Sequence, residues 1–177
     1  MMEDTKAIFL SYASQDVGAA RRIADTLRAA GFDVWFDQSE LRGGDAWDVL
    51  IRKRIKGCIL FVPLISKNTE LRGEGYFRLE WKRAVDRSLL MGDDQGFIMP
   101  VAVGETTEAR ARVPDRFRER QWSRLSTDVA LAAFVERVAQ TISRPGNGGG
   151  KRALPDQANA ASAVKAGAGV GAYTASK

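Results

Sequence analysis

Glu80 is the residue of this chain best placed to do chemistry. It follows Tyr76 by four positions, so both side chains share one face of a helix, and Trp81 stands next to it. The chain has no histidine, which excludes Ser-His and Cys-His hydrolases and zinc sites built on histidine. A carboxylate among aromatic rings suits catalysis on a cationic substrate. The alternative for an isolated glutamate is a solvated helix acid paired with a neighbour such as Arg83.

Length and composition indicate one globular domain. The chain has 177 residues, of which 45% are hydrophobic and 28% charged, enough for a real core. No apolar run approaches the roughly 20 residues of a membrane-spanning helix, and no signal peptide is recognisable. The single cysteine, Cys58, lies in an apolar run, where a buried reduced thiol fits a cytoplasmic protein.

The net charge of +5 is concentrated at the end of the chain. Residues 144–177 account for +4 of it, which leaves residues 1–143 almost neutral. We therefore expect no nucleic-acid-binding body. The arginine-rich segment 105–124 also contains acids, so we expect it to form a solvated face.

A change of composition divides the chain into two parts. From Pro145 a Pro-Gly-Asn-Gly-Gly-Gly stretch leads into a segment rich in Ala, Gly and Ser. This composition predicts a domain over 1–143 and a flexible tail or linker over 144–177. Two interpretations stay open, a frayed terminus and a link to another module.

Apolar patterning in residues 1–143 alternates between strand-like and helix-like segments. Such alternation predicts a doubly wound α/β sheet of parallel strands, and the uninterrupted apolar run 58–65 indicates a strand buried on both faces. The predicted strands cover 7–11, 32–36, 58–65, 97–103 and a short stretch near Trp122. Four helices are predicted. The first follows Ser14, the second contains Trp47 to Ile55, the third covers about 76–90, and the fourth starts after Thr127 and ends at about Ser143.

Turn and cap residues refine this pattern. Ser14 is predicted to cap the first helix at its N-terminus, and Gly31 to end that helix. Ligands of parallel sheets lie beyond the carboxyl ends of the strands. The loops after Ser11, Phe36 and Ile65, together with the loop after the fourth strand, should therefore share one edge, where we expect the function.

Four segments, in this order, resemble the signature segments of Toll/interleukin-1 receptor (TIR) domains. Each is weak alone, and their order over about residues 5–143 carries the resemblance. They are the first box Ile8-Phe-Leu-Ser-Tyr-Ala-Ser-Gln-Asp16, the second strand and BB loop of bacterial members (31–37 with Leu41 and Trp47), the third strand with its serine (58–66), and the helix bearing the glutamate of enzymatic members (76–84).

The resemblance implies a flavodoxin-like fold with five parallel strands in the order 2-1-3-4-5 and helices on both faces. It also implies two possible activities. Some TIR domains cleave NAD⁺ at the nicotinamide–ribose bond, giving ADP-ribose or a cyclic form, and in bacteria this serves anti-phage defence. Others act only as scaffolds that bind further TIR domains. NAD⁺ would be a substrate, and neither a cofactor nor a metal is implied.

A single carboxylate suffices for NAD⁺ cleavage. Nicotinamide leaves as a neutral molecule, so no general acid is needed, unlike at an ordinary glycosidic oxygen. The site must stabilise the oxocarbenium charge and hold the ribose hydroxyls, and one ionised carboxylate can do both. By the resemblance, Glu80 has this catalytic role.

Substrate-binding candidates gather around the first strand and the glutamate helix. Tyr76 matches the aromatic residue that precedes the glutamate in related enzymes and would stack on nicotinamide, although packing at a helix start explains it nearly as well. Ser11, Tyr12 and Ala13 end the first strand and would line a nucleotide cleft. A turn-forming Ser11 and a half-buried Tyr12 ring are equally good explanations.

The loop after the second strand supplies the remaining candidates. Asp37 and Leu41 are further substrate-binding candidates by the resemblance, although bracing of the loop is the favoured role of Asp37. Trp47 fits the core better than a ligand contact, because it shares helical spacing with neighbouring apolar residues. In the family, the BB loop, here Gln38–Ala46, contacts the next copy, so self-association is expected.

Two competing functions remain. A non-catalytic scaffold for TIR–TIR interaction would keep the fold and the BB loop without depending on Glu80. A flavodoxin-like binder of a nucleotide such as FMN would give a coloured protein, and no feature of the sequence favours it specifically.

Overall fold

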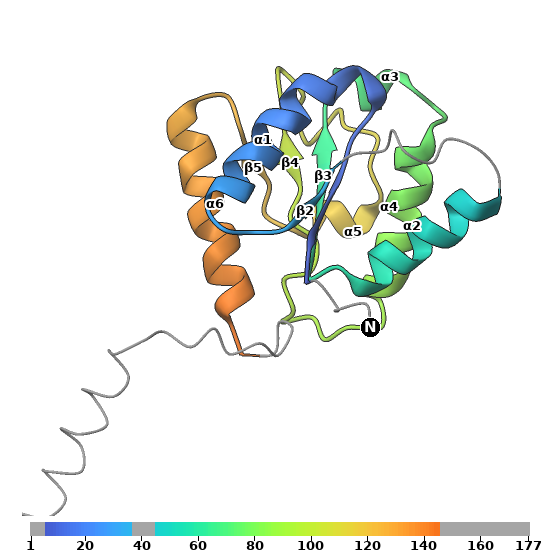
Figure 1. Cartoon of the computed structure of the whole chain (residues 1–177). Coiled ribbons are helices and arrows are strands. Elements are labelled where there is room, and N and C mark those ends of the chain that lie inside the picture. Colours follow the sequence, from blue (N-terminus) through green and yellow to red (C-terminus); the bar gives the residue numbers. More distant parts are fainter. Residues whose placement is uncertain (1–5, 37–44, 146–177) are drawn as a thin grey trace, which may run out of the picture.

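Five parallel strands form one sheet in the order β2-β1-β3-β4-β5. The computed structural model describes residues 6–36 and 45–145. This order is the predicted flavodoxin-like one, and it brings the carboxyl ends of the strands to one edge (Figure 1). The strands are β1 (Ile8–Ser11), β2 (Val34–Trp35), β3 (Leu60–Ile65), β4 (Val101–Ala102) and β5 (Ser123–Arg124).

Helices cover both faces of the sheet (Figure 1). One face carries α1 and α6, and the other carries α2 and α4. None of the described helices combines the length and apolar character of a bilayer-spanning segment. The helical elements are the 3₁₀ turn η1 (Ser14–Asp16), α1 (Val17–Ala29), α2 (Asp45–Gly57), α3 (Lys67–Leu71), α4 (Tyr76–Ser88), α5 (Asp115–Arg118) and α6 (Asp128–Ser143).

Two separate cores lie on the two faces of the sheet. Successive side chains of a strand point to opposite faces, so Leu10 belongs to the core under α1 and α6, and Phe9 to the core under α2 and α4. All six residues of β3 are buried. The apolar run that predicted this strand is therefore explained by contacts with both cores.

The fourth strand is shorter than predicted. Instead of 97–103, it consists of an isolated bridge at Ile98 and the two residues of β4. On the β3 side, the Phe61 amide donates to the Phe97 carbonyl at 2.8 Å, but Pro63 has no N–H to continue the ladder. The interruption follows from this proline in the middle of the sheet.

The two cap predictions for α1 have different outcomes. Ser14 does not cap the helix: it opens η1, and Asp16 occupies the N-cap, although its side chain accepts no capping hydrogen bond from the amides of the helix. The prediction that Gly31 ends the helix is confirmed, because its φ is 91°. The Gly31 amide donates to the Arg28 carbonyl at 2.9 Å, and the Phe32 amide donates to the Leu27 carbonyl at 3.1 Å. These two bonds form a Schellman motif.

The segments predicted to be irregular or solvated are more ordered than expected. The polar stretch 66–75 contains α3, which begins at a capping box between Ser66 and Thr69. Arginines of the segment 105–124 donate hydrogen bonds to backbone carbonyls, so this segment is not only a solvated face. Arg118, for example, donates to the carbonyls of Glu108 and Ala111, both at 2.7 Å.

Candidate functional site

Glu80 lies on the inward face of α4 and is 1% exposed. The helix packs on the core through Phe77 and Trp81, whereas Leu89 lies at its end and is 64% exposed. At its start, Gly75 has a φ of 157°, and a Cβ there would lie 2.8 Å from the Phe77 ring. This close approach holds the first turn of α4 against the core, and Glu80 follows one turn later.

The hydroxyl of Ser11 donates a hydrogen bond of 2.5 Å to Oε2 of Glu80. Ser11 is the last residue of β1 and is fully buried. The bond joins two residues 69 positions apart at the carboxyl end of a central strand. The structure thus brings two predicted site residues together where ligands of such sheets bind.

The protonation state of Glu80 differs from the expected ionised carboxylate. Burial raises the pKa of Glu80 from 4.5 to about 8, and the hydrogen bond from Ser11 opposes part of this rise. At pH 7 the side chain is therefore mainly a neutral acid while the site is closed. A cation brought next to it would favour the carboxylate again, because opposite charge lowers the pKa of an acid.

A narrow, mainly apolar cavity adjoins Glu80. It offers about 10 Å³ to the centre of a water molecule, which is room for about one water. Such a space admits no nucleotide in this conformation. Its walls come from β1, β2 and α2 and include Phe9, Trp35, Trp47, Ile51 and Arg54.

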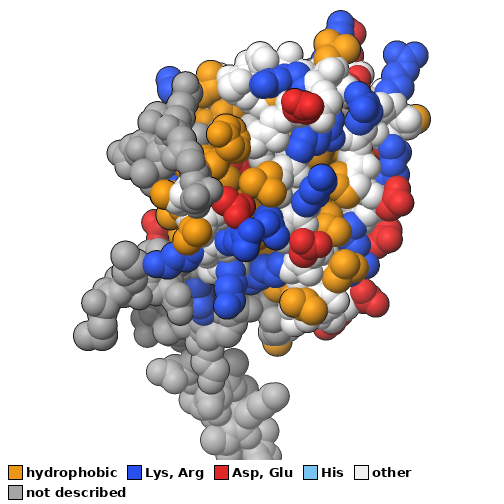
Figure 2. Space-filling model, turned by 90° about the vertical axis from the view of Figure 1, so that its right-hand side faces the viewer, with side chains coloured by type: hydrophobic (Ala, Val, Ile, Leu, Met, Phe, Trp, Pro, Cys, Tyr) orange, Lys and Arg blue, Asp and Glu red, His pale blue; other side chains and the backbone are white. Residues whose placement is uncertain are grey.

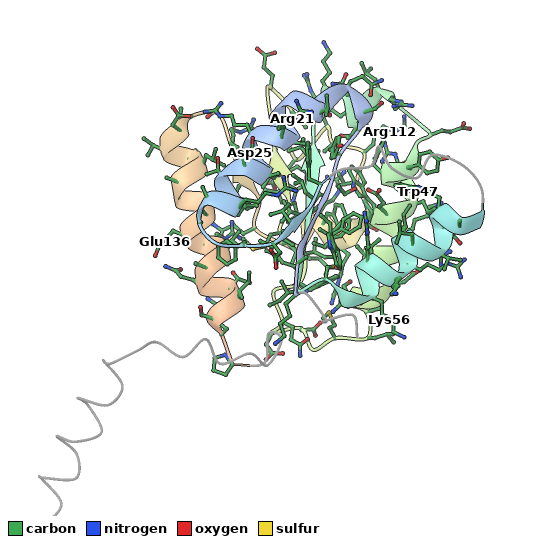
Figure 3. All side chains as sticks on the ribbon, in the orientation of Figure 1. Arg21, Asp25, Trp47, Lys56, Arg112 and Glu136 are labelled. Carbon is green, nitrogen blue, oxygen red and sulfur yellow. The ribbon has the colours of Figure 1, made fainter. Side chains whose placement is uncertain are left out.

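Two aromatic rings meet between α2 and α4. Trp47 is 7% exposed and part of the core, as predicted, and Figure 3 marks it beside α4. Its indole Nε1 is buried without a hydrogen-bond partner in the described part of the chain. Tyr76 is 54% exposed and makes an edge contact with Trp47 at 5.8 Å between ring centroids. Tyr76 is therefore open to a ligand, and Trp47 has a spare donor near Glu80.

The remaining candidates of the first strand point in different directions. Ala13 is buried on the Glu80 side of the sheet, whereas Tyr12 is buried in the core under α1 and α6. The Tyr12 ring stacks on Phe36 at 5.3 Å. The structure brings Ser11 and Ala13 to the side of Glu80 but leaves Tyr12 on the opposite face. Asp37, Leu41 and residues 38–44 of the BB loop lie outside the described residues.

A second polar network, not expected from the sequence, joins the ends of β1 and β3. Ser66 donates from Oγ to Oδ2 of Asp16 at 2.5 Å, and Asn68 donates from Nδ2 to Oδ1 at 2.7 Å. Both Asp16 and Ser66 had been noted only as parts of separate motifs. Their pairing over 50 positions fixes the loop after Ser11 to the start of α3.

The described acids and the single cysteine do not cluster. No group of three or more Cys, Asp or Glu side chains there is close enough to hold an ion, and the chain has no histidine. The arrangement offers one buried acid, a hydroxyl that orients it, and the exposed ring of Tyr76 in contact with Trp47.

Comparison with solved structures supports the fold. A metazoan TIR-STING receptor from C. gigas, solved with 2',3'-cGAMP, superposes with a TM-score of 0.61 at 21% identity, over 82% of this chain and 42% of the receptor chain. The TIR domains of the activated Roq1 resistosome, which directly recognises the pathogen effector XopQ, give 0.57 at 15% identity, over 77% of this chain and 99% of theirs. The chain thus spans less than half of the TIR-STING receptor.

Sequence comparison identifies the family. No curated protein matches the sequence significantly. The family profile described as TIR domain, however, matches residues 8–140. This range includes β1, which ends at Ser11, and α4, which carries Glu80. The chain belongs to the TIR domain family.

Proposed function

We propose that this TIR domain cleaves NAD⁺ at the nicotinamide–ribose bond, with Glu80 as the catalytic residue. The observation that carries the proposal is the buried Glu80 carboxyl group, held by Ser11 at the ligand-binding edge of a parallel sheet. A strongly raised pKa in such a place is typical of functional sites. The products would be nicotinamide and ADP-ribose or its cyclic form.

Binding of the substrate changes the charge of Glu80. The nicotinamide ring carries a positive charge, which lowers the pKa of the adjacent acid, so Glu80 releases its proton to solvent. In the low dielectric of the buried site, the carboxylate attracts the positive charge strongly. The hydroxyl of Ser11 keeps the carboxylate oriented in this step.

Bond cleavage then needs no acid. The electron pair of the C–N bond goes to the nicotinamide nitrogen, nicotinamide leaves neutral, and the positive charge moves to the ribose as an oxocarbenium ion. Glu80 stabilises this ion. A water oxygen adds to the ribose carbon and loses a proton, giving ADP-ribose. For the cyclic product, an adenine nitrogen adds in place of water.

Access to Glu80 requires a change of conformation. The present cavity holds about one water, and Trp47 and Tyr76 meet beside it. We propose that copies of the domain associate through the BB loop, Gln38–Ala46, that this association gives access to Glu80, and that Tyr76 then stacks on nicotinamide. Asp37 and Leu41 belong to this proposed substrate-binding surface, with Ser11 and Ala13 at its base.

The biological setting proposed for this activity is NAD⁺ depletion or nucleotide signalling in a cytoplasmic anti-phage response. NAD⁺ is the substrate, and no separate cofactor takes part. These proposals come from the family and not from the geometry.

The second candidate function is a non-catalytic TIR scaffold. The small cavity and the neutral Glu80 favour it, because in this conformation the acid serves as a buried partner of Ser11. A scaffold would need the TIR–TIR surfaces only, so loss of Glu80 would leave its assembly unchanged.

Nicotinamide release at several protein concentrations separates the two functions. The proteins to compare are the wild type, Glu80→Gln, Glu80→Ala and Glu136→Gln, the last a matched change of an exposed acid on α6. NAD⁺ cleavage by Glu80 predicts release that rises steeply with concentration and disappears in both Glu80 variants only. Equal turnover in all four proteins removes Glu80 from the mechanism.

A further inference from the structure

A basic hollow lies on the flank of α4 opposite to the Glu80 cavity. It is open to solvent and offers about 550 Å³. Its cationic groups come from α4, from the segment that precedes α5 and from α5 itself, and the lining that the structure describes contains no Asp or Glu. Figure 2 shows the side of the molecule that α2 and α4 cover, where blue side chains outnumber red ones. The five cations of the hollow are Arg78, Lys82, Arg110, Arg112 and Arg118.

The absence of carboxylates distinguishes this hollow from the surface around it. On the other flank of α4, Asp48 lies 2.7 Å from Arg52 and 3.8 Å from Arg83. Near β5, Arg116 lies 2.9 Å from Glu119. None of the five cations of the hollow makes an ion pair within the described residues. The described residues therefore leave their positive charge without a carboxylate partner.

Two of the five cations, Arg78 and Arg118, are fixed by hydrogen bonds to backbone carbonyls. Arg78 donates to the carbonyls of Thr69, Arg72 and Arg112, and lies over the Trp81 ring at 5.1 Å. Figure 3 marks Arg112 near the start of α4. Burial, followed by the nearby charge of Arg112, lowers the pKa of Arg78. The guanidinium groups of Arg78 and Arg112 thus lie close together, and no carboxylate of the described residues lies between them.

The other three cations are not needed for the fold. Lys82 and Arg110 are exposed and make no hydrogen bond or ion pair in the described structure, and Arg112 has only a bond of 3.5 Å to the Glu70 carbonyl. Arg118, in contrast, is fixed by two carbonyls. The free side chains of Lys82 and Arg110 lie beside fixed guanidinium groups, around small residues such as Ala111. This arrangement leaves space and hydrogen-bond donors for a ligand.

We propose that this hollow binds a small anion bearing two or more phosphate charges, either free or as part of a nucleotide. Guanidinium groups bind phosphate oxygens through paired hydrogen bonds, and a concave basic surface concentrates anions. The volume is that of a small-molecule site rather than of an extended groove for a polymer. The hollow and the Glu80 cavity share no lining residue, so binding here does not require NAD⁺ cleavage.

Calorimetric titration with pyrophosphate, ADP-ribose and adenosine tests this site, combined with amide NMR shifts to locate each ligand. The double variant Lys82→Gln/Arg110→Gln removes the two cations without structural bonds. Arg21→Gln/Lys56→Gln removes the same net charge from exposed positions outside the hollow, both marked in Figure 3. A Glu80→Ala protein isolates this site from the proposed catalytic one.

We expect pyrophosphate and ADP-ribose to bind and to shift amides of 73–82 and 109–114, and adenosine to leave these unchanged. The affinity should fall about tenfold or more in Lys82→Gln/Arg110→Gln and with added salt. It should persist in Arg21→Gln/Lys56→Gln and in Glu80→Ala. Unchanged affinity in the first variant, an equal loss in its charge-matched control, or no pyrophosphate binding at millimolar concentration overturns the proposal.

Discussion

The two flanks of α4 differ in whether their ionisable side chains are buried or hydrated. On the flank toward α2, a single acid is buried beside a cavity that holds one water, and burial keeps it neutral. On the other flank, five cations surround an open hollow of about 550 Å³ and keep their charges in contact with solvent. The comparison shows that the cost of a charge depends on its hydration more than on the number of its neighbours. Substitutions on the flank toward α2 should therefore change the stability much more than substitutions in the hollow.

The largest effect is expected from Trp47→Ala. Trp47 fills the space between α2 and α4 beside the cavity, so its truncation should lower the free energy of unfolding by about 3–5 kcal/mol. Urea denaturation followed by circular dichroism measures this value. Arg112→Ala, on the hollow flank, is the reference and should change stability by less than about 0.5 kcal/mol. Similar losses in the two variants would refute the contrast between the flanks.

Glu80→Gln should change how stability depends on pH. The folded protein binds the Glu80 proton with a pKa of about 8, against 4.5 when exposed, so unfolding releases a proton between these values. The stability of the wild type relative to Glu80→Gln should thus fall as pH rises from about 5 to 8, by up to about 1.4 kcal/mol per pH unit. It should level off above pH 8.

Denaturation of both proteins at several pH values checks this dependence. Glu136→Gln serves as the control, because Glu136 is exposed on α6 and its exchange should leave the pH profile unchanged. Parallel pH profiles for the wild type and Glu80→Gln would mean that Glu80 is ionised in the folded protein.

Ser11→Ala should have a smaller effect. It removes the 2.5 Å hydrogen bond that opposes the rise of the Glu80 pKa, at a cost of about 1–3 kcal/mol in stability. The pKa of Glu80 should rise further, so the pH profile of nicotinamide release should move to higher pH. Ser14→Ala is the control, because Ser14 is exposed and does not contact Glu80. An unchanged profile in Ser11→Ala would show that the hydroxyl does not tune the acid.

The smallest effect on stability is expected in the hollow. Lys82→Gln/Arg110→Gln removes two exposed cations without structural bonds, so the free energy of unfolding should stay within about 0.5 kcal/mol of the wild type. Relief of repulsion should make any change a gain. A loss of more than about 1 kcal/mol would assign these side chains a structural role.

The parts of the fold that could be predicted depend on local pattern. The apolar run of β3, the glycine after α1 and the stripe of α6 follow from side-chain periodicity and backbone geometry, and all three are in place. Pro63 was visible in the sequence, but its interruption of the β3–β4 ladder depends on which strand pairs with β3. The capping residues Ser66 and Thr69 of α3 are also local signals, because their spacing is that of a capping box at a helix start.

The parts of the site that could not be predicted depend on tertiary contacts. The helix bearing Glu80 was predicted, but its bond to Ser11 and its neutral state follow from burial in the assembled core. The same holds for the Asp16 network and for the Tyr12 ring on the opposite face. Sequence places these residues near a strand end, and only packing decides which side chains meet.

Titration of the Glu80 carboxyl carbon by ¹³C NMR, with and without a saturating NAD⁺ analogue that resists cleavage and keeps the positive charge of its nicotinamide ring, tests most directly whether this acid faces a substrate cation. We predict a free-protein pKa of about 8 that falls by at least one unit with the cationic analogue, while neutral nicotinamide leaves it unchanged. A carboxyl group that titrates near 4.5, or one that does not respond to the cationic analogue, would contradict the proposed role of Glu80.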